Sequence, residues 1–188
     1  LPSLCEVLVN TLERLESVSI TSNGMIPEAW EAFLPELKAL FRRNNVDFSF
    51  HVSIDGPRRI HDFLRGTPGG FEDATTSVRL AKDFGIDTEI HSTLSNVNVY
   101  YAPFLCHLAQ QMNVDIAFRV AVEIERLEND DVISELALDE NQKSFAADFL
   151  RSLVCQQGTS STGRRLFYDF LARRLTGEAV EAPECIFQ

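Results

Sequence analysis

The chain has 188 residues, 45% of them hydrophobic, and a formal net charge of −11. These values allow one sizeable hydrophobic core and argue against a protein that follows the phosphates of a nucleic acid. No run of about 18 apolar residues is present, so we expect no membrane span. The four cysteines, Cys5, Cys106, Cys155 and Cys185, are widely scattered, which favours reduced thiols in a cytoplasmic protein over a disulfide framework.

Helices and strands are predicted to alternate along the first two thirds of the chain. Apolar residues at helical spacing or in β-rich runs, together with Gly and Pro at the boundaries, define the elements. Helices are expected over residues 2–15, 27–41, 69–85 and 99–112, and strands over residues 17–24, 46–56, 86–96 and 114–124. Strands that alternate with helices predict a parallel sheet built from βαβ units.

The alternation ends after residue 124. The acidic segment 125–140 predicts a loop with short turns, and helices are expected over residues 140–157 and 164–177. A Gly- and Ser-rich break lies between these two helices, and an extended tail follows them. We therefore divide the chain into residues 1–126 and a helical C-terminal region, residues 127–188.

Each predicted strand has one apolar and one polar face, because side chains alternate along a strand. In the second strand the two faces carry Phe48, Phe50, Val52 and Ile54 against Ser49, His51, Ser53 and Asp55. In the third strand they carry Ile90 and Leu94 against Glu89, His91 and Thr93. A parallel sheet that is covered by helices on both faces would be almost wholly apolar. The pattern instead predicts helices on one face and a polar hollow on the other.

This pattern predicts an α/β fold in which residues 1–126 form an open partial (β/α) barrel of parallel strands with outer helices. Active sites of such barrels lie at the carboxyl ends of the strands. These ends carry the sequences SNG, SIDG and STLSN, which gather polar groups where chemistry is expected.

An ordered series of short motifs resembles the radical S-adenosylmethionine enzymes. The motifs are Ser22-Asn23-Gly24, Ser53-Ile54-Asp55-Gly56, His61-Asp62, Arg65-Gly66 and Gly69-Gly70-Phe71. The resemblance covers residues 1–123 and points to the branch with a SPASM-like C-terminal extension, which binds auxiliary iron–sulfur clusters. The fold that it implies, an open partial barrel, agrees with the fold predicted from the strand faces.

The resemblance implies an enzyme that cleaves S-adenosylmethionine reductively with a 4Fe–4S cluster and modifies a peptide or a small metabolite. Members of the family hold the cluster with a Cys-x3-Cys-x2-Cys loop, which this sequence does not contain. We therefore expect the chain to be an N-terminally truncated piece of a longer enzyme and to be inactive alone. An electron donor such as flavodoxin or ferredoxin is implied as a partner.

The resemblance also implies site residues. Those expected to bind S-adenosylmethionine are Ser22, Asn23, Ser53, Asp55, Arg65, Thr93 and Arg119. Cys185, in a Pro-Glu-Cys sequence that resembles the start of an auxiliary-cluster region, is expected as a metal ligand. No catalytic residue is predicted.

Structural roles remain open for several of these residues. Asn23 and Asp55 precede glycines and suit turns. Arg119 suits a pair with Glu89 or Glu123. We expect His61 and Asp62 to clip a loop, with Asp62 accepting backbone N–H groups, and His91 to be a satisfied interior histidine. The cysteines at 5, 106 and 155 are expected on helices as small hydrophobic residues.

Two other functions also fit the sequence. The first is a non-catalytic, degenerate barrel that binds a peptide or a protein partner. The second is an ordinary barrel lyase or hydrolase that uses the polar hollow without iron.

Overall fold

A computed structural model describes residues 1–121, 135–155 and 161–179. These residues form an α/β fold around a four-stranded sheet with the order β1-β2-β3-β4. The chain divides into two compact units, one made of residues 1–93 and 103–119 and the other of residues 94–102 and 120–188. The α/β fold class predicted from the sequence is confirmed. The predicted boundary between residues 126 and 127 lies outside the described residues.

The helices and strands follow in the predicted order, with one addition. The strands are β1 (Ser17–Ser22), β2 (Asp47–Ser53), β3 (Asp87–Leu94) and β4 (Asp115–Val120). The helices are α1 (Pro2–Thr11), α2 (Pro27–Arg43), α3 (Arg58–Arg65), α4 (Gly70–Asp83), the 3-10 turn η1 (Val99–Tyr101), α5 (Ala102–Met112), α7 (Glu140–Cys155) and α8 (Thr162–Leu175).

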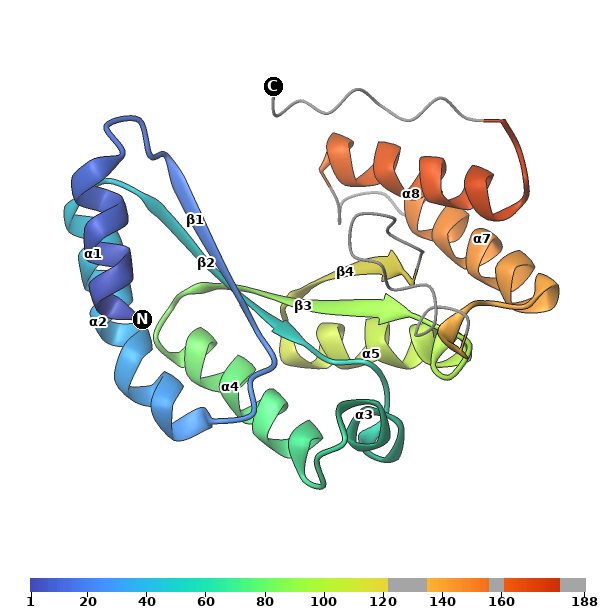
Figure 1. Ribbon diagram of the computed structural model, residues 1–188, viewed down its shortest axis with the longest axis horizontal. Helices are drawn as coiled ribbons and strands as arrows, with labels where there is room; N and C mark the ends of the chain where they lie inside the picture. The colour runs from blue at the N-terminus through green and yellow to red at the C-terminus, as the bar shows by residue number, and fades with distance from the viewer. Residues whose placement is uncertain (122–134, 156–160, 180–188) are drawn as a thin grey trace. The chain divides into compact units, whose positions relative to one another are not determined.

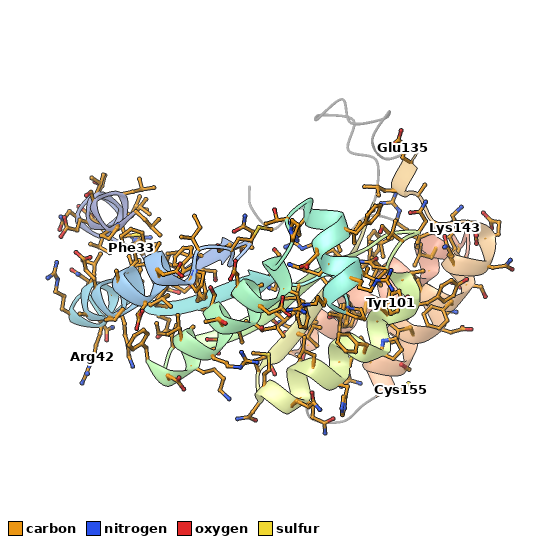
Figure 2. The ribbon with its side chains drawn as sticks, turned by 90° about the horizontal axis from the view of Figure 1, so that it is seen from below. Phe33, Arg42, Tyr101, Glu135, Lys143 and Cys155 are labelled. Atoms are coloured by element: carbon orange, nitrogen blue, oxygen red, sulfur yellow. The ribbon has the colours of Figure 1, made fainter. Side chains whose placement is uncertain are left out.

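The strands of the sheet follow one another in chain order, and β2 pairs in parallel with both β1 and β3. The helices α1, α2, α4 and α5 lie on one side of these strands (Figure 1). Figure 2 shows α4 and α5 side by side, and Lys82 of α4 donates a 2.5 Å hydrogen bond to the carbonyl of Met112 in α5. Sequential parallel strands with helices on one face are the arrangement of a section of a (β/α) barrel.

The two faces of the sheet differ as the sequence predicts. Phe50 and Val52 on the helix-covered face of β2, and Ile54 just after the strand, are fully buried. On the same side, Leu37 and Phe41 of α2 form a buried cluster with Cys5 of α1, and Phe33 and Val18 pack against it. On the other face, Ser49, His51 and Ser53 are only half-buried. Burial of the apolar side chains stabilises this unit through the hydrophobic effect.

The sequence predicts no helix between residues 56 and 69 and places His61 and Asp62 in a loop. The structure instead has the helix α3 over Arg58–Arg65, which begins after Pro57 and ends at Gly66. Gly66 has a φ of 63°, the left-handed conformation that commonly closes a helix. Ile60, Phe63 and Leu64 stand at helical spacing, which is a signal for this helix that the prediction did not use.

In the second unit, the helices α7 and α8 pack against each other, with Ala146, Ala147 and Leu150 of α7 fully buried. Tyr100 of η1 meets Phe145 of α7 edge-on at 5.0 Å between ring centroids. Within the described ranges, no helix is long and apolar enough to cross a membrane.

Candidate functional site

The carboxyl end of β2 carries a buried acid, Asp55, whose side chain is 8% exposed. One carboxylate oxygen, Oδ2, lies 2.6 Å from the guanidinium of Arg65, the last residue of α3. The other, Oδ1, accepts a long hydrogen bond of 3.4 Å from the backbone N–H of Thr93 near the end of β3. Asp55 therefore ties together the ends of two neighbouring strands and the helix α3.

His61 lies beneath this acid and is fully buried. Its Nδ1 accepts a 3.2 Å hydrogen bond from the backbone N–H of Asp55, so this nitrogen carries no proton. Burial lowers the pKa of His61; the nearby charge of Asp55 raises it and that of Arg65 lowers it further. The ring is therefore neutral and supports the turn after β2.

Asp62 links α3 to the first turn of α4, as the sequence analysis expects. Its two carboxylate oxygens accept hydrogen bonds of 2.9 Å from the backbone N–H groups of Gly69 and Phe71. Burial raises the pKa of Asp62, but these two hydrogen bonds and the nearby positive charge of Arg58 act against it, and the pKa is lowered overall. Since Gly69, the residue that precedes α4, has no side chain to cap the helix, Asp62 supplies the cap from α3. Beside it, Arg58 pairs with Glu72 of α4.

Ser22 and Asn23 make local turns after β1. Ser22 accepts a hydrogen bond from the N–H of Gly24, and Asn23 accepts one from the N–H of Met25. Ser22 is in register with Val52, which lies on the helix-covered face of the sheet. These contacts agree with the turn role that the sequence left open, and the cofactor role of both residues stays a prediction.

Ser53, Thr93 and Arg119 lie on the open face of the sheet. Ser53 is half-buried, whereas Thr93 and Arg119 are exposed. Ser53 is in register with His91, one strand away. The structure therefore brings Ser53, Asp55, Arg65 and Thr93 together around the ends of β2 and β3. Cys185 lies outside the described residues, as does Glu123.

A row of polar side chains from β1, β2 and β3 also crosses the open face of the sheet. Ser19 Oγ lies 2.8 Å from Ser49 Oγ, which lies 3.1 Å from Nε2 of His51. Glu89 Oε2 lies 4.0 Å from Nε2 of His51 and 3.0 Å from Nε2 of His91. His91 is half-buried and has a hydrogen-bond partner in Glu89, as expected of a satisfied histidine. Its ring also lies against the ring of His51, which the sequence does not predict. The spacing Glu-x-His within a strand is a signal for this cluster, but its third member, His51, is identified only by the register between β2 and β3.

The described cysteines do not fit an iron–sulfur cluster. Cys5 in α1, Cys106 in α5 and Cys155 at the end of α7 are free. Burial raises the pKa of Cys5, against the opposing effect of the N-terminal charge, and burial raises that of Cys106 to about 11. In the part of the chain that the structure describes, no cysteine belongs to a group of three or more side chains that could hold a metal ion. Cys155 is exposed, which corrects the expectation that it packs as a small hydrophobic residue.

Comparison with known proteins identifies partial relatives. No family model matches the chain. An AdoMet-dependent heme synthase from Oleidesulfovibrio alaskensis is 32% identical over 62 residues, which are 32% of this chain and 16% of that protein. One from Nitratidesulfovibrio vulgaris is 38% identical over 50 residues, which are 26% of this chain and 14% of that protein.

Two solved structures show a looser likeness. One is native anSMEcpe with bound AdoMet, with a TM-score of 0.48 and 15% identity over 81% of this chain and 48% of that chain. Another is native anSMEcpe with bound AdoMet and Kp18Cys peptide, with a TM-score of 0.47 and 15% identity over 81% of this chain and 49% of that chain. The present chain thus spans about half of each solved chain and a far smaller share of the curated relatives.

Proposed function

We propose that this chain forms part of the S-adenosylmethionine-binding barrel of a radical S-adenosylmethionine enzyme. The observation that carries the proposal is the convergence of Ser53, Asp55, Arg65 and Thr93 at the carboxyl ends of β2 and β3. Ligands of barrel enzymes bind at this end of the strands. The two curated relatives support the assignment, because AdoMet in their names is the cofactor that the sequence motifs imply.

The residues at this end suit a ligand with several hydroxyl groups. Asp55 contacts Arg65 and the backbone N–H of Thr93 through its two oxygens, and carboxylate oxygens are acceptors for ligand hydroxyl groups. Ser53 adds a half-buried hydroxyl that both donates and accepts. We assign these two residues to the ribose or carboxylate region of the cofactor. Arg65 fixes the orientation of Asp55, and the exposed Asn23, Thr93 and Arg119 line the approach from neighbouring strands.

The cofactor would supply radical chemistry when cleaved by a 4Fe–4S cluster, and this chain's part is to bind and orient it. Because the described cysteines do not fit such a cluster and the sequence has no Cys-x3-Cys-x2-Cys loop, no step of the reaction is assigned to these residues. We propose that the complete enzyme modifies a peptide or a small metabolite and takes electrons from a flavodoxin- or ferredoxin-like donor. Cys185 remains a proposed ligand of an auxiliary cluster.

Binding of S-adenosylmethionine to the 188-residue chain tests the proposal without the cluster. Saturation-transfer NMR should show transfer from the protein to the ribose protons, and Ser53→Ala and Asp55→Asn should each weaken binding about tenfold. Asp87→Asn, which changes an exposed acid at the opposite end of β3, is the matched control and should leave binding unchanged. No transfer to S-adenosylmethionine, or equal weakening by all three variants, would contradict the assignment and leave the non-catalytic binding module as the better description.

A further inference from the structure

We propose that His51, Glu89 and His91 form a binding site for a divalent transition-metal ion on the open face of the sheet. The three residues each offer one ligand atom, and these atoms lie within 4.8 Å of one another. Two imidazoles and one carboxylate are a donor set that binds zinc and ferrous iron in proteins. The inference does not depend on the proposed S-adenosylmethionine function.

The strands fix the positions of all three residues. His51 in β2 is in register with Glu89 in β3, and His91 is two residues beyond Glu89 on the same face. Neighbouring strands of a sheet lie about 4.8 Å apart, so residues in register have their side chains close together. The hydrogen-bonded ladder therefore holds the donors together before any ion binds, which reduces the entropy lost on binding.

The distances between donor atoms are close to those of a metal site. Glu89 Oε2 is 3.0 Å from Nε2 of His91 and 4.0 Å from Nε2 of His51. Ligands of a tetrahedral zinc ion, bound at about 2.0 Å, are roughly 3.3 Å apart. Small rotations of the His51 and Glu89 side chains would bring the three atoms to that spacing without moving the strands.

The cluster is accessible from the open face. The side chains of His51, Glu89 and His91 are 16%, 12% and 19% exposed. The two imidazole rings lie 4.3 Å apart between centroids and are tilted by 31°, and in each ring the nitrogen Nε2 lies within 4.0 Å of Oε2 of Glu89. Three protein ligands leave at least one coordination position for water or another ligand, which is the arrangement of an open rather than a closed structural site.

A purely structural role is the competing explanation. Ser49 contacts Nε2 of His51, and His91 and Glu89 share a hydrogen bond, so the row of polar side chains can be satisfied without an ion. In that case no metal would bind, or it would bind elsewhere. In the proposed site an ion displaces the hydroxyl of Ser49 from His51, and Ser49→Ala should therefore leave metal affinity equal or higher.

Calorimetric titration of the chelator-treated, fully reduced 188-residue chain with ZnCl2 tests the site. We expect one ion per chain, and His51→Asn and His91→Asn should each weaken its binding about tenfold or more. Substitution of residues that only hydrogen-bond to metal ligands already lowers metal affinity by about that factor, and loss of a ligand itself should cost at least as much. His107→Asn, which removes an exposed histidine on α5, is the matched control and should bind like the parent chain. No binding, or binding that both cluster variants retain, overturns the proposal.

Cobalt binding distinguishes the proposed site from a cysteine site, and NMR tests the site even if the variants do not fold. Co2+ at the proposed site should give visible bands without a thiolate-to-metal charge-transfer band; a strong band of that kind would assign binding to cysteines and overturn the proposal. If either cluster variant unfolds, the parent chain still decides the question. The chain has four histidines, and Zn2+ should shift the ring signals of His51 and His91 but not those of His61 and His107. Shifts confined to the latter two would contradict the site.

Discussion

The carboxylate of Asp55 and the guanidinium of Arg65 lie 2.6 Å apart and join the end of β2 to the end of α3. The two side chains differ in their access to solvent: that of Asp55 is 8% exposed and that of Arg65 is 30% exposed. Loss of the partner should therefore cost more free energy at the buried carboxylate than at the more exposed guanidinium. The charged groups that follow β2 therefore have separate roles: Arg65 pairs with the buried acid at the strand end, whereas Arg58 and Asp62 join α3 to α4.

Arg65→Gln should lower the free energy of unfolding by about 1–3 kcal/mol, because it leaves the buried Asp55 carboxylate without its cation. Urea unfolding followed by the fluorescence of Trp30, the single tryptophan, measures the unit that contains both residues. Arg59→Gln, an exposed change on the same helix, is the control and should cost less than about 0.5 kcal/mol. Equal effects of the two changes would show that the ion pair does not stabilise the fold.

Asp62→Asn should lower the free energy of unfolding by about 1 kcal/mol, because its amide cannot accept from both Gly69 and Phe71. Since the pKa of Asp62 is lowered in the folded chain, its contribution is present above the ordinary aspartate pKa of about 3.9 and is lost as the pH falls. The difference from the parent chain should therefore shrink between pH 7 and pH 3. Asp83→Asn, at the opposite end of α4, removes a negative charge from the C-terminal end of a helix and should not destabilise.

The strand faces were predictable because alternation along a strand depends on the sequence alone. Phe50 and Val52 are buried and Ser49 and His51 are half-buried, as the pattern of β2 requires. The contact between His51 and Glu89 was not predictable, because residues 38 positions apart meet only through the register of two strands. The contacts of helix α3 were likewise not predictable: His61, Asp62 and Arg65 bond to groups of the β2 end and of α4, which only the folded chain brings near them.

His61→Asn should reduce the pH dependence of stability in the weakly acidic range. Folding lowers the pKa of His61, mainly through burial, so the unfolded chain, with a pKa of about 6.5, takes up the proton first. The stabilising contribution of the neutral ring is complete above about pH 6.5 and is lost as the pH falls towards the folded-state value. Asparagine retains an acceptor near the position of Nδ1 but does not titrate. Measured by urea unfolding between pH 7.5 and 5.5, the free energy of unfolding should change less with pH in this variant than in the parent chain. His107→Asn is the control for the loss of a histidine and should behave like the parent chain. If the free energies of the His61 variant and the parent chain change in parallel with pH, folding does not lower the pKa of His61.

Gly24→Ala should destabilise the turn after β1 through two separable effects. Gly24 has a φ of 71°, and a Cβ built on it would lie 2.7 Å from Cγ1 of Val52 and 3.0 Å from the Cα of Ala74 in α4. The left-handed conformation alone costs a residue with a side chain about 1–2 kcal/mol, and the overlap adds about 1–3 kcal/mol. Gly66→Ala separates the terms, because its φ is 63° but a Cβ there meets nothing within 4 Å. We expect Gly24→Ala to lower the urea midpoint clearly more than Gly66→Ala; similar midpoints would mean that the close approach of β1, β2 and α4 at this end of the sheet does not limit the residue at position 24.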